Sequence, residues 1–165
     1  MQLTYVSFDK QKTTHHTLLE ELILPYAAEL DAHANRSTPT EFLRKWVQSI
    51  IRIHGDPDRH LAFCYDGDVL IGFLYGKVDH PDHKGFVKVG WGYVMEFYVL
   101  PEHRRKGYGT AMYAHLENLF AKDGVKTLYL TSDPVTGRPF WMSQGFVPAG
   151  ERSPENHMEI YVKNI

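Results

Sequence analysis

The sequence predicts a mixed α/β fold, in which helices flank one central, mostly antiparallel twisted sheet. Two observations lead to this class. The β-branched and aromatic runs that suit strands mostly follow one another, which favours antiparallel pairing. A strand–helix–strand unit lies between residues 92 and 131, near the middle of the chain. With 165 residues, the chain is predicted to form a single domain, 1–165, around one core.

The first third of the chain predicts a strand and two helical segments. Residues 2–8 have the pattern of a short strand. Apolar residues at helical spacing from Leu18 to Leu30 predict a helix, which Pro25 should break, kink or divide into two. Thr38 and Glu41 have the spacing of a capping box at the start of a second helix.

The next segments predict a hairpin and a long strand. Gly55-Asp56-Pro57 should end the second helix. Residues 61–65 and 69–78 read as antiparallel strands that turn at Asp66-Gly67. A long strand is predicted over residues 86–99, with a bulge or bend at its glycines.

The last third predicts two helices and three strands. An amphipathic helix follows residue 107 and closes at Asp123-Gly124. Residues 125–131 form the next strand, and residues 136–144 form a short helix. Strands beginning at residue 146 and spanning 158–163 complete the sheet.

Composition excludes several classes of protein. The formal net charge of −2 gives no general attraction to nucleic acid or to an anionic membrane. Cys64, the one cysteine, excludes an intramolecular disulfide and a cysteine-cluster metal site. The start lacks the pattern of a signal peptide, and no apolar run reaches membrane-spanning length. We therefore expect a soluble cytoplasmic protein that binds neither nucleic acid nor membrane.

The stretch from Gly92 to Ala111 predicts a site for a phosphate-bearing ligand. Its strand must end near Pro101, which cannot donate to a ladder. Three cations at 104–106 and two glycines then directly precede a helix. A helix start offers unpaired N–H groups and the positive end of the helix dipole, and glycine lets an anion approach the backbone. A solvated basic turn is the alternative.

The order Arg104-x-x-Gly107-x-Gly109, after a strand and Pro101, resembles the acyl-CoA pyrophosphate loop of the GNAT superfamily of N-acetyltransferases. The predicted order of strands and helices resembles that family over nearly the whole chain. The resemblance implies a GNAT-like fold and direct transfer of an acetyl group from acetyl-CoA, the acyl-donor cosubstrate, to an amine acceptor without a metal. It leaves a homodimer open.

The resemblance also implies where the cofactor binds. In the family the strand of residues 93–99 splays from the next one, and pantetheine enters the gap. Backbone groups of Phe97 and Val99 would bind it, one N–H polarising the thioester carbonyl. The N–H groups from Arg104 to Thr110 would bind the pyrophosphate, while at least one cationic side chain there can equally be solvated. The full set of predicted cofactor-binding residues is Phe97, Tyr98, Val99, Arg104, Arg105, Lys106, Gly107, Tyr108, Gly109, Thr110, Ser132 and Trp141.

Glu96 is the candidate catalytic residue, as the base that frees the amine of its proton. A carboxylate within a strand of aromatic and aliphatic residues is out of place unless it is functional or paired. Burial there would raise its pKa toward neutrality, where a general base is most useful. The alternative is that Glu96 pairs with an Arg or Lys on a neighbouring strand.

The residues from Phe140 to Phe146 resemble the family's F-Y-x-x-x-G-F element, whose tyrosine often protonates the leaving thiolate. Trp141 stands at that position, and its indole N–H is essentially non-acidic. Tyr98 and Tyr108 are possible substitutes, so the general acid is unassigned. Ser132 and Asp133 fall where the family often places a cofactor-facing asparagine, or they cap the following helix.

Three other readings follow from the sequence. Asp79, His80, Asp82 and His83 could ligate a metal, but a solvated loop is expected instead. Trp141 leaves open, as an alternative to the enzyme, a protein of the same fold that binds acyl-CoA with weak or no catalysis, as a sensor. A small nucleic-acid-binding module that uses residues 104–106 is the third reading, against which the acidic net charge counts.

Overall fold

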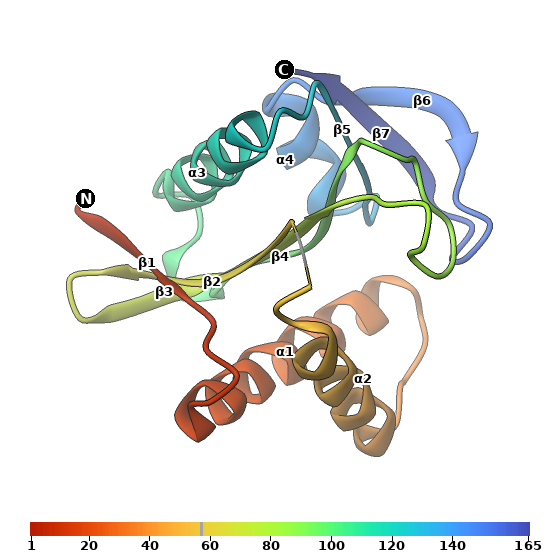
Figure 1. The fold of residues 1–165 in the computed structure, drawn as a ribbon. Coiled ribbons are helices and arrows are strands. Elements are labelled where there is room, and N and C mark those ends of the chain that lie inside the picture. Colours follow the sequence, from red (N-terminus) through yellow and green to blue (C-terminus); the bar gives the residue numbers. More distant parts are fainter. Residues whose placement is uncertain (57) are drawn as a thin grey trace.

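A computed structural model describes residues 1–56 and 58–165. Pro57, the last of the three residues predicted to end the second helix, lies outside these ranges. The elements follow the predicted order of strands and helices (Figure 1). They are β1 (Leu3–Ser7), α1 (Thr13–His33), α2 (Thr40–Ile53), β2 (Arg59–Asp66), β3 (Val69–Val78), β4 (Gly92–Val99), a 3-10 turn (Pro101–His103), α3 (Tyr108–Lys122), β5 (Thr127–Thr131), α4 (Gly137–Ser143), β6 (Val147–Arg152) and β7 (Glu159–Asn164).

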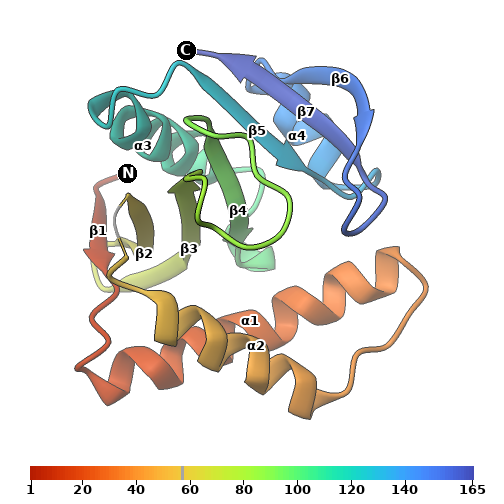
Figure 2. The same ribbon diagram turned by 45° about the vertical axis from the view of Figure 1, so that its right-hand side comes forward.

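The seven strands form one sheet in the order β1-β2-β3-β4-β5-β7-β6. All neighbours are antiparallel except β4 and β5, which are parallel and are connected through α3. Helices α1 and α2 cover one face of the sheet, and α3 and α4 cover the other (Figures 1 and 2). The predicted mixed α/β class with a mostly antiparallel sheet is confirmed.

An apolar core fills each side of the sheet. Leu19 and Ile23 of α1 pack with Phe73 of β3 on one side. Leu116 and Phe120 of α3 pack on the other side, in a cluster that also includes strand residues. Burial of these side chains on both faces fixes α1 and α3 on opposite sides of β4.

The structure corrects two predictions for the helices. Pro25 lies inside one continuous helix, so the division into two helices is wrong. Proline removes only one backbone donor, and the buried side chains of Leu22 and Ala27 hold the helix on the sheet around it. Helix α2 begins at Thr40 without a capping box, because the Thr38 backbone N–H and hydroxyl both donate to Asp31 instead.

The predicted long strand over 86–99 is also too long. Only Gly92–Val99 is a strand, and residues 86–91 are a loop held by Asp79. The Asp79 carboxylate accepts from the Lys88 N–H at 2.8 Å and from the Tyr129 hydroxyl, and its backbone carbonyl accepts from the Gly90 N–H. Asp79 is 1% exposed, so the expectation that it lies in a solvated loop is wrong.

Candidate active site

A cleft opens where β4 and β5 diverge. The two strands pair only at Gly92 with Leu128 and at Tyr93 with Tyr129. Beyond Tyr93, no strand in the described part of the chain pairs with the edge of β4 that faces β5, so this edge is open to a ligand. The cleft has a volume of about 1240 Å³, and its walls come from α1, α2, β4, the segment before α3, β5 and α4.

A β-bulge in β4 decides which way Glu96 points. Tyr75 of β3 pairs with Glu96, whereas Gly76 pairs with Val94, so Met95 is the extra residue. Val94 packs on the α3 side of the sheet, and Met95 packs on the α1 side. Simple alternation would return Glu96 to the α3 side, but the bulge keeps it on the α1 side, facing the cleft.

Glu96 is half-buried and pairs with no cation among the residues that the structure describes. The Tyr26 hydroxyl of α1 donates to its Oε2 at 2.7 Å. Burial raises the pKa of Glu96 to about 7, and the hydrogen bond from Tyr26 lowers it in part. The carboxyl group therefore exchanges a proton near neutral pH, as a general base must.

The segment before α3 presents free backbone donors. Gly107, with φ of +86°, adopts the left-handed conformation that favours glycine and directly precedes the helix. A Cβ at Gly109 would lie 3.1 Å from the Phe140 ring, so glycine lets α3 approach α4 closely. In residues 1–56 and 58–165, no acceptor receives a hydrogen bond from the N–H groups of Gly107 to Thr110. These groups are the backbone donors at a helix start that the sequence predicts to bind an anion.

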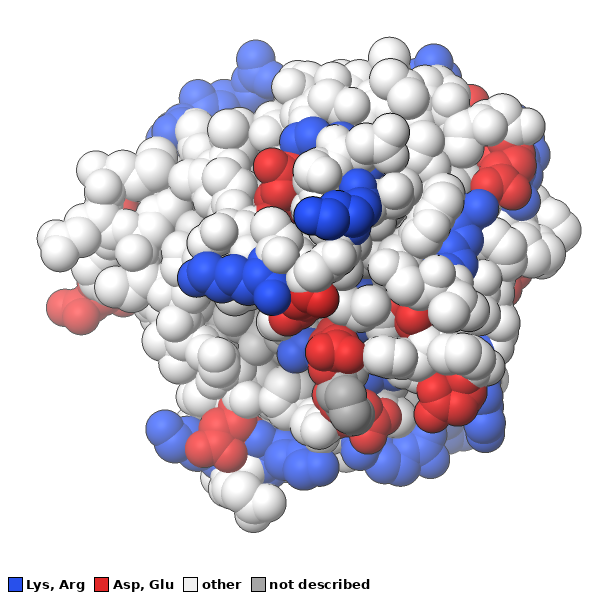
Figure 3. All heavy atoms as spheres, turned by 45° about the horizontal axis from the view of Figure 1, so that its top comes forward, with Lys and Arg blue, Asp and Glu red and all other residues white. Residues whose placement is uncertain are grey.

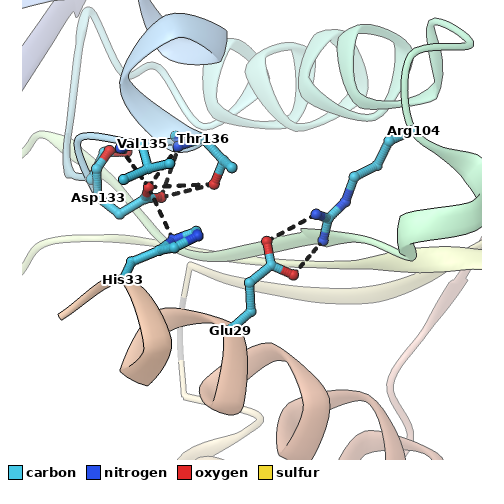
Figure 4. A network of polar contacts seen from close by, with 8 residues as sticks. Glu29, His33, Arg104, Asp133, Val135 and Thr136 are labelled. Atoms are coloured by element: carbon cyan, nitrogen blue, oxygen red, sulfur yellow. Dashed lines mark hydrogen bonds and ion pairs between the residues drawn. The ribbon is translucent and has the colours of Figure 1, made fainter. Parts of the chain in front are cut away.

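Arg104 uses its side chain to fix this segment to α1 (Figure 4). Its guanidinium donates to both carboxylate oxygens of Glu29, at 2.9 and 2.7 Å, and its Nε donates to the Val99 carbonyl at 2.9 Å. The hydrogen bonds with Glu29 raise the pKa of Arg104. All of these donors are engaged within the protein, so the side chain positions the segment.

The neighbouring side chains differ in their access to the cleft. Arg105 is exposed and lines the cleft. Lys106 donates to the Glu102 carbonyl at 2.8 Å, and Tyr108 donates to Asp66 at 2.6 Å. Neither Lys106 nor Tyr108 is among the lining residues, so Tyr108, which the sequence offers as a possible general acid, lies outside the cleft.

On the opposite wall, Asp133 caps the segment that leads into α4. Its carboxylate accepts from the backbone N–H groups of Val135, Thr136 and Gly137, at 2.9, 2.7 and 3.0 Å. His33 of α1 lies 3.3 Å from the same carboxylate (Figure 4). The sequence leaves open whether Asp133 faces the cofactor or caps the following helix, and in the structure its side chain makes the capping contacts. Ser132 lines the cleft beside it.

Trp141 is 7% exposed and lies among aromatic rings. Its ring centroid is 5.1 Å from that of Phe97 and 5.6 Å from that of Tyr113. It also lines the cleft, so it offers an apolar surface and an N–H donor but no acidic proton.

The cleft brings most of the predicted site residues together. Those that line it are Glu96, Phe97, Tyr98, Val99, Arg104, Arg105, Gly107, Gly109, Thr110, Ser132 and Trp141. The sequence reasoning missed Tyr26, Glu29 and His33, all on α1. Their spacing of three and four residues places them on one helix face, a signal that could have identified them.

The remaining sequence-based alternatives concern metal, membrane and nucleic acid. In the part of the chain that the structure describes, no group of three or more His, Cys, Asp or Glu side chains is placed to hold a metal ion. None of its helices is long and apolar enough to cross a membrane. On the face shown in Figure 3, Lys and Arg are intermixed with Asp and Glu.

Solved structures share this fold. PaiA N-acetyltransferase from Thermoplasma acidophilum, in complex with coenzyme A, is 16% identical with a TM-score of 0.72, and both chains are covered completely. An acetyltransferase from Salmonella typhimurium that modifies the N-terminal serine of a 50S ribosomal subunit protein is also 16% identical, with a TM-score of 0.71 and coverage of 100% of this chain and 96% of that chain. An aminoglycoside 6′-N-acetyltransferase complexed with coenzyme A is 15% identical, with a TM-score of 0.68 and coverage of 98% and 96%.

The sequence itself carries the assignment to a family. No curated protein matches the chain. A family model described as the acetyltransferase (GNAT) family matches residues 26–146, which include the end of α1 from Tyr26 onward, the bulged strand β4 and the segment before α3. The chain therefore belongs to the acetyltransferase (GNAT) family, and it is an acyltransferase.

Proposed function

We propose that this protein transfers an acetyl group from acetyl-CoA to the primary amine of a small molecule or peptide, by direct attack on the thioester. One observation carries the proposal. A half-buried carboxyl group, Glu96, faces the cleft between β4 and β5 without a cationic partner in the residues described, and its pKa is about 7. Such a group accepts a proton from an ammonium at neutral pH.

The chemistry follows from this arrangement. An alkylammonium has no lone pair, so Glu96 first takes its proton. The nitrogen then attacks the thioester carbonyl carbon, the C–N bond forms, and the C–S bond breaks. The nitrogen loses its second proton to solvent, and the CoA thiolate takes a proton from solvent. A thiol of pKa roughly 8.5 leaves tolerably without a dedicated acid, so Trp141 is compatible with turnover.

The cleft has the donors that acyl-CoA needs. We place the pyrophosphate at the N–H groups from Gly107 to Thr110, with the Arg105 side chain adding positive charge. The open edge of β4 offers backbone groups to pantetheine, and Trp141 offers its ring to the thioester end. Two structural neighbours were solved in complex with coenzyme A, which supports acyl-CoA as the ligand of this protein.

Two adjacent charge reversals test the cofactor site. Arg105→Glu puts a negative charge in the cleft and should weaken acetyl-CoA binding by roughly tenfold to a hundredfold, the value of one or two charged hydrogen bonds. Lys106→Glu changes the net charge equally, but its side chain lies outside the cleft. It should weaken binding less than about threefold.

Calorimetric titration with acetyl-CoA measures both variants. Equal losses of affinity in the two variants would show that only the general field matters and would move the pyrophosphate away from Arg105. An absence of CoA binding to the unaltered protein would refute the proposed cofactor altogether.

A further inference from the structure

We propose that the acceptor carries a single ammonium group on an apolar, preferably aromatic, body, and is not a polyamine or an aminoglycoside. This inference rests on the proposed function and narrows it to one substrate class. It follows from how the charges and the apolar side chains of the cleft are distributed.

Four carboxylates line the cleft, those of Glu29, Asp31, Glu96 and Asp133. Glu29 gives both oxygens to the Arg104 guanidinium. Asp31, which is 7% exposed, accepts from Arg36 Nε and from the Thr38 N–H, both at 2.8 Å. These two acidic groups are therefore occupied by contacts within the protein.

Asp133 is occupied in the same way. Three backbone N–H groups donate to its carboxylate, and the imidazole of His33 lies 3.3 Å away. Glu96 is the exception, since its side-chain partner is the neutral Tyr26 hydroxyl. Among the described residues the cleft thus holds one carboxyl group that can pair with an incoming ammonium.

The cleft that Glu96 faces has an apolar wall. Leu43 and Trp46 of α2, Tyr93 and Met95 of β4, and Met158 before β7 line the cleft. Two large apolar side chains lie exposed at its lining, Phe42 of α2 at 53% and Val135 before α4 at 58%. Exposed apolar side chains on a concave surface indicate that an apolar ligand covers them.

A second positive charge on the acceptor would find no partner. The other charged groups at the cleft are cations: Arg105 lines it without an ion-pair partner among the described residues, Arg36 lines it in a pair with Asp31, and the Lys45 ammonium lies 5.3 Å from the centre of the Phe42 ring. An ammonium desolvated against this wall loses its hydration without a compensating carboxylate. The site therefore favours a monocation and disfavours a polycation.

The test compares three amines at saturating acetyl-CoA, by release of CoA thiol. They are 2-phenylethylamine, the polar 2-methoxyethylamine of similar basicity, and spermidine. Burial of the phenyl ring should raise kcat/KM for 2-phenylethylamine about tenfold or more above that for either other amine. A higher kcat/KM for spermidine, or for an aminoglycoside such as kanamycin, would overturn the inference.

A matched pair of variants locates the apolar wall. Phe42→Ser removes an exposed ring from the cleft and should lower the ratio of kcat/KM for 2-phenylethylamine to that for 2-methoxyethylamine about threefold or more. Val69→Ser removes an apolar side chain of similar exposure, 52%, in the β2–β3 hairpin and should leave the ratio unchanged. An unchanged ratio in Phe42→Ser contradicts the assignment of this wall.

Equilibrium binding separates this inference from the proposed function. If no amine is acetylated, the proposed function fails, but calorimetry on the protein saturated with CoA still tests the acceptor class. Saturable binding of 2-phenylethylamine, tighter than that of spermidine, supports the inference. Tighter binding of spermidine, or no binding of 2-phenylethylamine, overturns it.

Discussion

At the scale of single residues, the pair of Tyr26 and Glu96 sets the proposed chemistry. Burial alone would raise the pKa of Glu96 so far above its ordinary value that the carboxyl group would stay protonated at neutral pH. A protonated carboxyl group is a poor base. The Tyr26 hydroxyl donates to the ionised form and returns the pKa to about 7. Tyr26 packs against Phe73 and Tyr98, so its hydroxyl is held in place. We therefore regard it as a positioning residue.

Tyr26→Phe removes the hydroxyl but keeps the ring. The pKa of Glu96 should rise by about 0.5 to 1 unit, which corresponds to one neutral hydrogen bond. The rising limb of the profile of kcat/KM against pH should move to higher pH by that amount. Tyr65→Phe, on β2 outside the cleft, is the control and should not move it. An unshifted limb in Tyr26→Phe would show that the hydroxyl does not act on Glu96.

At the scale of elements, α1 joins the two walls of the cleft. Glu29 reaches Arg104 before α3, and His33 reaches Asp133 before α4 (Figure 4). The pair of Glu29 and Arg104 is bidentate and partly buried, with side-chain exposures of 26% and 33%. Pairs of this kind stabilise more than exposed ones do.

Glu29→Ala should lower the free energy of unfolding by about 1 to 2 kcal/mol, because it leaves the Arg104 guanidinium partly buried without its partner. Glu20→Ala is the control on the same helix. Its partner Arg44 is 64% exposed, so the loss should stay below about 0.5 kcal/mol. Urea denaturation measures both. Equal losses would mean that the pair with Arg104 contributes no more than a surface contact.

The contacts of α1 also show what the sequence could predict and what it could not. The segment from Arg104 to Gly109 was recognisable because a phosphate site made of consecutive backbone groups is local. Glu96 stood out as a carboxylate in an apolar strand. Its partner Tyr26 lies 70 residues away, and Glu29 lies 75 residues from Arg104. Helical spacing places Tyr26 and Glu29 on one face of α1, but it does not reveal which distant residues that face contacts.

The bulge at Met95 was beyond prediction for a related reason. The sequence pointed to Gly90 and Gly92 as positions of a bulge or bend, but the extra residue is a methionine with no conformational signature. The bulge follows from pairing with β3 and packing against α1, both of which depend on the assembled sheet. The direction of Glu96 is therefore a property of the fold.

At the scale of the whole molecule, we propose that residues 1–165 fold as one domain, because the sheet continues from β1 to β6. Ionisation of Glu96 lowers the stability of that domain at high pH. The folded-state pKa of Glu96 lies above the ordinary value of 4.5, so the fold favours the protonated form. This contribution is fully present below pH 4.5 and is lost as the pH rises through about 7.

Glu96→Gln removes the ionisable group and keeps an acceptor for the Tyr26 hydroxyl. Its free energy of unfolding relative to the unaltered protein should increase between pH 5 and pH 8 by on the order of 2 kcal/mol. Thermal denaturation at the two pH values measures this. A difference between the two proteins that does not change with pH would show that Glu96 titrates normally.

The profile of kcat/KM against pH, measured with acetyl-CoA and an amine for the unaltered protein and for Glu96→Gln, tests the central claim most directly. The unaltered protein should show a rate that rises through an inflection near pH 7. Glu96→Gln should lose that inflection and at least roughly a hundredfold in kcat/KM at pH 8, the usual contribution of a general base. Full activity of Glu96→Gln at every pH would contradict the account.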